Sequence, residues 1–137
     1  MKAVVLDTSA IIRFYLPDGP IPDLLEESIQ SAWNGETSLL IPDLALAEVT
    51  QVFRKKEKAG YLNVEETDEL ISLVLDLPLE VIAHYEMIRD ALTLARLTDL
   101  TVYDALFLAL AGKKNALLIT ADKKLQQAYA NRPSYEK

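Results

Sequence analysis

The sequence predicts a single α/β domain built on a parallel sheet. Short apolar runs rich in β-forming residues alternate along the chain with longer segments whose apolar residues recur at helical spacing. Strands that are separated by helices pair in parallel through right-handed crossovers. A length of 137 residues suits one ordinary domain, and a hydrophobic fraction of 50% is enough for one core.

The chain begins with a predicted strand, helix and strand. The strands are Val4–Leu6 and Ser38–Ile41, and Pro42 bounds the second. The helix between them is predicted from five apolar residues at helical spacing: Ile21, Leu24, Leu25, Ile29 and Trp33. Asn34 and Gly35 then end the helical pattern.

Two further helices follow the second strand. The first opens at Pro42 and Asp43 and runs to Gly60, and the next opens with a capping box formed by Asn63 and Glu66. The residues predicted to face the core are Ala45, Val49, Val52 and Phe53 in the first helix and Leu70, Ile71 and Val74 in the second.

The rest of the chain continues the alternation. The elements predicted in order are a strand at Leu79–Ala83, a helix from about Tyr85 to Leu97, a helix capped by Thr101 that ends at Gly112, a strand at Ala116–Thr120 and a helix from Lys123. Residues 1–130 are assigned to one domain and residues 131–137 to a polar C-terminal tail.

Four acidic residues stand beside apolar runs, near the places where strands lead into helices. Asp7 follows the first strand and Asp122 follows the last, whereas Asp104 and Glu48 lie inside apolar helical patterns. In open parallel sheets, functional sites form at the carboxyl ends of the strands. The four carboxylates are therefore expected to converge there.

Each of these acids also has a structural explanation. Asp7 or Ser9 could cap the helix after the first strand, Asp122 could cap the last helix, and Asp104 stands three residues after Thr101, as in a capping box. A cap has no meaning for Glu48, which lies mid-helix, although a nearby lysine could pair with it. Three hydroxyl residues beside the acids are either simple turn residues or groups that orient the carboxylates: Thr8, Ser9 and Thr120.

A shared acidic site would require a cation. Carboxylates about 5 Å apart repel one another by roughly 3 kcal/mol per pair at an effective dielectric constant near 20. Because the chain has no cysteine and only one histidine, His84, the ligands must be oxygen atoms. Mg²⁺ or Mn²⁺ suits such a site, which makes metal-assisted phosphodiester hydrolysis the predicted reaction class.

Charge and hydropathy limit the partners. The net charge of −7 argues against a protein that binds nucleic acid through a broadly basic surface, although Arg13, Lys123 and Lys124 could offset repulsion near the acids. The longest apolar run, Ala105–Ala111, is far shorter than the roughly 20 residues that span a bilayer. Since Asp7 also interrupts the N-terminal apolar stretch, we expect a cytoplasmic protein without a signal peptide or membrane anchor.

Four stretches of the chain together resemble a known family. They are VVLDTSAII (Val4–Ile12), LALAEVTQVF (Leu44–Phe53), TVYDALFLALA (Thr101–Ala111) and LLITADKKL (Leu117–Leu125). In order and spacing they resemble the four acidic motifs of PIN-domain ribonucleases. The length and the order of elements are similar to those of the VapC-type toxins of prokaryotic toxin–antitoxin pairs.

The resemblance implies a three-layer α/β/α sandwich with a parallel central sheet, a Mg²⁺-dependent endoribonuclease site and a homodimer. By the same resemblance, Asp7 and Asp104 would be the principal metal ligands, and Glu48 and Asp122 would complete the catalytic pocket. Thr8, Ser9 and Thr120 would support them. The implied partners are an RNA substrate and a small antitoxin protein.

Other functions remain compatible with parts of this pattern. A housekeeping RNA-processing nuclease would look similar in this fold, and a catalytically silent module that binds RNA or protein could retain it. A receiver-like phosphoacceptor domain normally has an adjacent acidic pair after the first strand, but here Thr8 follows Asp7. Haloacid-dehalogenase chemistry needs a second aspartate where this chain has Ser9.

Overall fold

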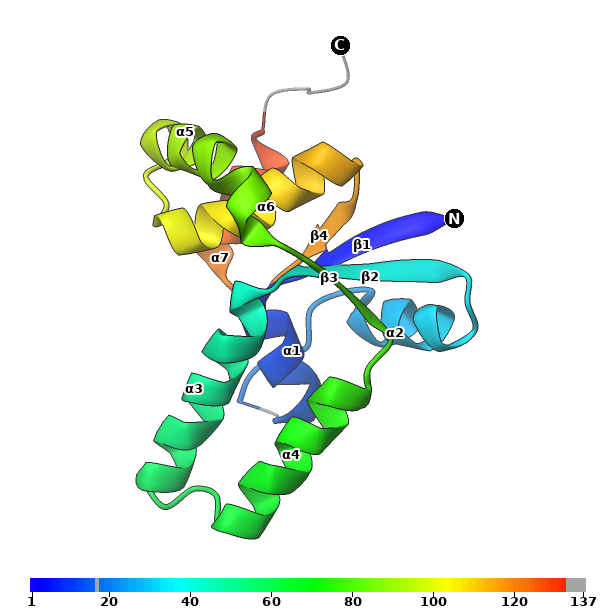
Figure 1. Ribbon diagram of the computed structural model, residues 1–137, viewed down its shortest axis with the longest axis vertical. Coiled ribbons are helices and arrows are strands. Elements are labelled where there is room, and N and C mark those ends of the chain that lie inside the picture. The colour runs from blue at the N-terminus through cyan, green and yellow to red at the C-terminus, as the bar shows by residue number, and fades with distance from the viewer. Residues whose placement is uncertain (17, 133–137) are drawn as a thin grey trace.

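A four-stranded parallel sheet lies between two layers of helices in the computed structural model, which describes residues 1–16 and 18–132 (Figure 1). The strands are β1 (Lys2–Leu6), β2 (Thr37–Pro42), β3 (Leu79–Ile82) and β4 (Leu117–Ile119). Their order across the sheet is β3-β2-β1-β4, and every neighbouring pair is parallel. The predicted α/β/α sandwich with a parallel sheet is confirmed.

The helices divide between the two faces of the sheet (Figure 1). One layer contains α1 (Thr8–Tyr15), α2 (Leu25–Trp33), α3 (Leu44–Lys58) and α4 (Val64–Asp76). The other contains the 3₁₀ helix η1 (His84–Met87), α5 (Ile88–Thr98), α6 (Val102–Lys114) and α7 (Lys123–Ala130). In Figure 1, α3 and α4 extend away from the sheet as a pair of neighbouring helices.

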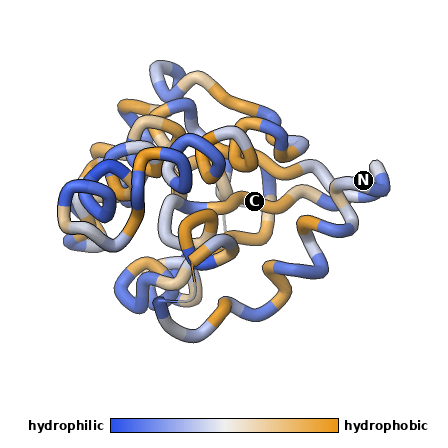
Figure 2. Tube along the Cα trace, turned by 90° about the horizontal axis from the view of Figure 1, so that it is seen from below, coloured by the Kyte–Doolittle hydropathy of each residue, from blue (hydrophilic) through white to orange (hydrophobic). Residues whose placement is uncertain are grey.

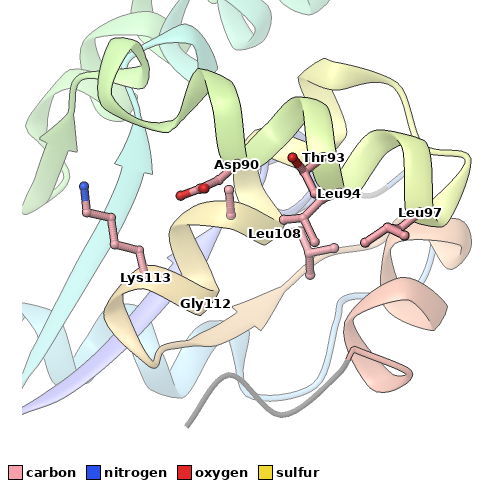
Figure 3. Close-up of a pocket in the computed structure, with 8 residues that line it drawn as sticks. Asp90, Thr93, Leu94, Leu97, Leu108, Gly112 and Lys113 are labelled. Carbon is pink, nitrogen blue, oxygen red and sulfur yellow. The ribbon is translucent and has the colours of Figure 1, made fainter. Parts of the chain in front are cut away.

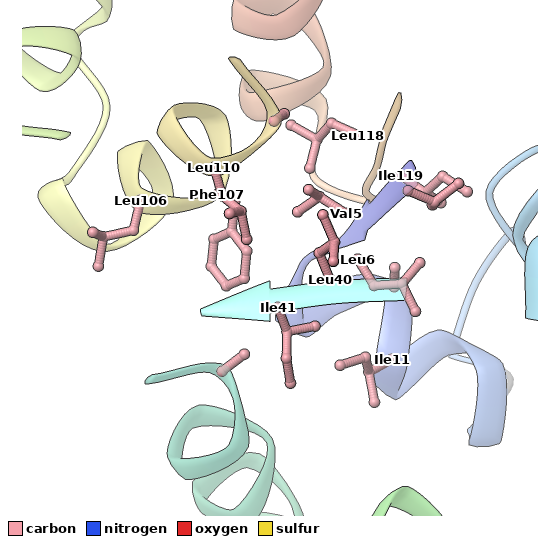
Figure 4. Close-up of a cluster of buried hydrophobic side chains, with 14 of the residues drawn as sticks. Val5, Leu6, Ile11, Leu40, Ile41, Leu106, Phe107, Leu110, Leu118 and Ile119 are labelled. Atoms are coloured by element: carbon pink, nitrogen blue, oxygen red, sulfur yellow. The ribbon is translucent and has the colours of Figure 1, made fainter. Parts of the chain in front are cut away.

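The core surrounds the sheet on both faces. Residues Ala105–Ala111 of α6 are all buried, because this helix packs against the strands on one side and against α5 and α7 on the other. Figure 4 shows Phe107 of α6 on one side of β2 and Ile11 of α1 on the other. Along the other helices, hydrophobic and hydrophilic residues follow one another in turn, as expected for helices with one buried face (Figure 2).

The strand order creates a crevice at the carboxyl end of β1. From β1 the chain adds β2 and then β3 on one side, and it returns to place β4 on the other side. Ligands of open parallel sheets bind where the strand order reverses in this way. Asp7 follows β1 directly, and its backbone N–H donates to the carbonyl of Ile119 in β4 (3.2 Å). The sequence thus places a carboxylate at the switch point of the sheet.

The connection between β1 and β2 differs from the prediction. It contains two helices, α1 and α2, and α2 begins only at Leu25. Pro20 and Pro22 explain the late start, because proline lacks a backbone N–H and interrupts a helix interior. Three of the five apolar residues from which that helix was predicted lie outside the core, since Ile21, Leu24 and Trp33 are 47%, 46% and 56% exposed.

Most other elements lie close to their predicted positions. The capping box of Asn63 and Glu66 is present, and Val74 is buried while Leu70 and Ile71 are partly buried. The helix predicted from about Tyr85 starts as the 3₁₀ turn η1 before α5 continues it. In the region predicted as a tail, Asn131 is the C-cap of α7. Residues 133–137 lie outside the described residues.

Within the described ranges 1–16 and 18–132, no helix combines the length and the apolar character that crossing a membrane requires. The buried run in α6 is apolar because the sheet and two helices cover it.

Candidate active site

Asp7 is a buried carboxylate whose two oxygens are both hydrogen-bonded. Only 4% of the residue is exposed. Its Oδ1 accepts from the backbone N–H of Ala10 (2.8 Å) and from the hydroxyl of Ser9 (2.7 Å), and its Oδ2 accepts from the hydroxyl of Thr120 (2.6 Å). The bond from Ala10 makes Asp7 the N-cap of α1. The cap therefore orients this carboxylate at the switch point.

The hydroxyls of Ser9 and Thr120 connect two strand ends. Their oxygens lie 3.2 Å apart. The backbone N–H of Ala121 donates to Ser9 Oγ (2.9 Å), and that of Asp122 donates to Thr120 Oγ1 (2.9 Å). Because both hydroxyls also donate to Asp7, the segment after β4 is held in register with the segment after β1. Of the two roles left open by the sequence, these contacts favour orientation of the carboxylate.

Glu48 reaches the same region from the middle of α3. Its Oε1 accepts a hydrogen bond from the hydroxyl of Thr8 (2.7 Å), which follows Asp7 in the chain. The residue is partly buried, and among the described residues its carboxylate bonds to this hydroxyl and pairs with no lysine. A neutral donor orients the carboxylate without neutralising its charge, so Glu48 adds negative charge to the site.

Asp104 lies in the first turn of α6, and Asp122 is the residue before α7. The Thr101 hydroxyl accepts from the backbone N–H of Asp104 (3.1 Å), so the cap of α6 uses the Asp104 backbone rather than its carboxylate. Asp122 caps α7 by accepting from the backbone N–H of Leu125 through Oδ1 (3.0 Å). Asp104 is partly buried and Asp122 is exposed.

All four acids line one cavity of about 310 Å³. Its wall is formed by Asp7, Thr8, Ser9, Ile12, Arg13, Asp18, Glu48, Val52, Asp104, Phe107 and Asp122. We call it the acidic cavity. The predicted convergence is thus present in the structure, while the catalytic and metal-binding roles of these residues stay predictions.

Basic residues and the histidine are distributed unevenly around this cavity. Of the three cations expected near the acids, only Arg13 lines it. Lys124 is outside the lining and lies 3.8 Å from Asp99, although its charge is near enough to lower the pKa of Asp104. His84 pairs with Asp43 outside the cavity lining. The contribution of Asp18 was not predicted, because nothing in its local sequence distinguishes it from an ordinary loop acid.

Burial and mutual repulsion change the acidity of two of these groups. Burial raises the pKa of Asp7 from 3.8 to about 6, with a smaller contribution from the charge of Asp104, although its three hydrogen bonds oppose the shift. The pKa of Asp104 is also raised, first by burial and then by the charge of Asp122. The ionised form of each carboxylate is therefore destabilised in the folded protein, and a cation nearby would relieve this cost.

The donor set fits a hard divalent cation. Every polar group that the acids present is an oxygen, and the cavity lies at a crevice that solvent can reach. In the described part of the chain, no three acidic or histidine side chains form a ready-made cage around one ion. Mg²⁺ does not need such a cage, because it retains several waters and is held by one or two carboxylates together with substrate phosphates.

A second cavity, of about 410 Å³, lies between α5 and α6 (Figure 3). Three leucines line it, Leu94, Leu97 and Leu108, with Asp90 and Lys113 at its sides. It contains none of the four acids found in the acidic cavity. Its lining is mainly apolar, and Asp90, Thr93 and Lys113 are its polar members.

The raised pKa of Asp7 predicts how stability depends on pH in the absence of metal. Between pH 4 and 6 the folded state binds the proton more tightly than the unfolded chain, so the free energy of unfolding falls as the pH rises through this window. A shift from 3.8 to about 6 corresponds to about 3 kcal/mol lost at pH 7. Asp7→Asn should abolish this loss, which urea unfolding in EDTA at pH 4.5 and pH 7 measures.

Asp68→Asn provides the matched control for that measurement, because Asp68 is an exposed acid on α4. It should retain the pH dependence of the wild type. If the free energy of unfolding falls equally for Asp7→Asn and for the wild type between the two pH values, the ionisation of Asp7 does not destabilise the folded state.

A family model and a similar protein each match most of the chain. A family model described as PIN domain matches residues 4–131. Ribonuclease VapC3 from Pyrobaculum aerophilum is 32% identical over 131 residues, which cover 94% of this chain and 95% of that protein.

Two solved structures share the fold. The crystal structure of PAE2754 from Pyrobaculum aerophilum has a TM-score of 0.72 at 20% identity and covers 93% of this chain and 79% of that one. The crystal structure of VapBC2 from Rickettsia felis, bound to a DNA fragment from their promoter, has a TM-score of 0.64 at 18% identity, with 92% of both chains covered.

Proposed function

This chain belongs to the PIN domain family, and from this premise we propose that it is a divalent-metal-dependent endoribonuclease. One observation carries the proposal: Asp7, Glu48, Asp104 and Asp122, which follow or lie in four different elements, line a single cavity. Mutual repulsion and burial disfavour such a cluster unless it binds a cation. The ribonuclease name of the Pyrobaculum aerophilum relative supports RNA as the substrate.

The proposed ligands of the ion are Asp7 and Asp104, with Glu48 and Asp122 completing the site directly or through water. When bound, a divalent ion lowers the pKa of water and polarises a phosphoryl oxygen, which is the chemistry that phosphodiester hydrolysis needs. Mg²⁺ is the proposed ion, and Mn²⁺ would serve the same oxygen donors.

The residues of the chain contribute orientation and charge. Ser9 and Thr120 donate to opposite oxygens of Asp7, and Thr8 donates to Glu48, so the supporting hydroxyls fix the direction of two carboxylates. With a pKa of about 6, Asp7 is mostly ionised at neutral pH and can act as an oxygen ligand. Orientation before the substrate arrives lowers the entropic cost of reaching the reactive geometry.

We also propose that the protein is the toxin of a type II toxin–antitoxin pair and acts in the cytoplasm as a homodimer. The names of the VapC3 and VapBC2 relatives support this assignment. The charge of the acidic cavity favours an inhibitory partner that inserts an arginine, because a guanidinium can pair with a carboxylate through two hydrogen bonds. Exposed apolar side chains on α5, among them Ile88 and Leu92, offer a surface for self-association.

The purified protein should cut single-stranded or structured RNA in Mg²⁺ or Mn²⁺ and leave 5′-phosphate and 3′-hydroxyl ends. Excess EDTA should stop the reaction, because the oxygen donors alone cannot activate water. Sequencing of RNA 5′ ends from such reactions, and from cells after brief expression, measures both the chemistry and the target. Cutting that persists in excess EDTA would contradict the proposed metal dependence.

A further inference from the structure

Arg13 is the one cationic side chain among the described residues that line the acidic cavity. It lies in the last turn of α1, where a basic residue also suits the helix dipole. Its guanidinium, however, turns to the loop that follows, and Nη1 donates to the backbone carbonyl of Pro20 (2.8 Å). A neutral carbonyl holds this cation in place and leaves its charge uncompensated.

None of the described carboxylates that line the cavity forms an ion pair with Arg13. Five of them line the same wall, yet within residues 1–16 and 18–132 Arg13 takes part in no ion pair. The acid nearest to it in the sequence, Asp18, is paired instead with Lys56 of α3 (2.6 Å). Among the described residues, the guanidinium donates one hydrogen bond, to Pro20, and its remaining N–H donors can bind a ligand.

The segment Asp18–Pro20 is shaped to hold the guanidinium in this position. A Cβ added to Gly19 would lie 2.5 Å from Arg13 Nη1 and 3.1 Å from its Cζ, so the glycine provides the space that the guanidinium occupies. The ion pair between Lys56 and Asp18 fastens the same segment to α3. Arg13 is therefore positioned by its surroundings rather than free to move in solvent.

We propose that Arg13 binds a phosphate group of the RNA substrate at the acidic cavity, and that Gly19 and Pro20 position its guanidinium for this contact. A planar guanidinium matches phosphate through two parallel hydrogen bonds. It also offsets the repulsion between a cavity lined by five carboxylates and a polyanion. This inference rests on the proposed function and names a residue that determines substrate affinity at the same site.

RNA affinity and its salt dependence test the proposal. Binding of a single-stranded oligoribonucleotide is measured in Mg²⁺ in the Asp104→Asn background, where cleavage is not expected. Arg13→Ala should weaken binding about 10-fold and reduce the slope of log affinity against log salt by about 0.7, the contribution of one phosphate contact. Arg13→Lys should retain the slope but recover only part of the affinity, because the ammonium lacks the planar fork.

Gly19→Ala tests the position of the Arg13 guanidinium separately from its charge. It keeps every charge but displaces the guanidinium, and it should weaken binding in the same direction as Arg13→Ala. The change should cost little stability, because the atom it meets is the end of a flexible side chain. Arg89→Ala, at an exposed arginine of α5, is the matched control and should change affinity by less than about twofold.

Equal affinity and salt slope for Arg13→Ala and Arg89→Ala would overturn the phosphate contact, and wild-type affinity in Gly19→Ala would overturn the positioning role. Melting temperatures of all variants show whether a loss of binding reflects unfolding. If the wild type binds RNA but does not cleave it, the proposed function is contradicted. The affinities of Arg13→Ala and Arg89→Ala would still decide whether Arg13 binds a phosphate. Absence of RNA binding by the wild type would overturn both.

Discussion

Asp104→Asn and Asp7→Asn should each reduce RNA cleavage by about 10³-fold, equivalent to about 4 kcal/mol of transition-state stabilisation. Both residues line the acidic cavity, and an amide cannot replace a carboxylate as an anionic ligand. The effect should appear mainly in kcat, since the substrate contacts supplied by other residues remain. Initial rates over a range of RNA concentrations in Mg²⁺ measure it.

The fold should survive both changes. Asparagine at position 7 can still accept from the backbone N–H of Ala10 and cap α1, while its amide N–H₂ donates to Thr120, whose hydroxyl can turn to accept. At position 104 the cap of α6 depends on the Thr101 hydroxyl and the backbone. Asp68→Asn, at an exposed position on α4, should retain full activity, whereas near wild-type turnover in Asp104→Asn would show that its carboxylate is structural.

The sequence predicted the features that depend on local patterns. The apolar runs of β1 and β4 located Asp7 and Asp122 at strand ends, and the spacing from Thr101 to Asp104 located the start of α6. Caps and functional site were treated as alternatives, yet Asp7 and Asp122 serve as caps while they also line the cavity. The geometry that orients the side chain for the cap also turns it toward the strand ends.

The sequence did not predict which individual residues pair across long distances in the chain. Glu48 accepts a hydrogen bond from Thr8, forty positions away in the sequence. Lys56 of α3 forms an ion pair with Asp18, in the loop after α1. Trp33 belonged to the helical spacing that predicted this helix, but at the end of α2 it is 56% exposed. Spacing indicates which residues share a helix face, whereas the neighbouring elements decide which face is covered.

Mg²⁺ should stabilise the wild type and have much less effect on Asp104→Asn. An ion that binds only the folded state adds about 2.7 kcal/mol at a concentration one hundred times its Kd, which for a domain of this size raises the Tm by roughly 10 °C. The variant lacks one carboxylate and so binds the ion more weakly. In chelator the variant should melt at a higher temperature than the wild type. It lacks the carboxylate whose burial, and whose repulsion from Asp122, raise the pKa of Asp104.

Melting curves of the wild type and Asp104→Asn, in EDTA and in millimolar Mg²⁺, therefore test most directly whether the carboxylates form one metal site. We expect the variant to melt at the higher temperature in EDTA, and the wild type to gain several degrees on addition of Mg²⁺ while the variant gains little. Equal melting temperatures for the two proteins, unchanged by Mg²⁺, would contradict a shared metal site and the nuclease function that depends on it.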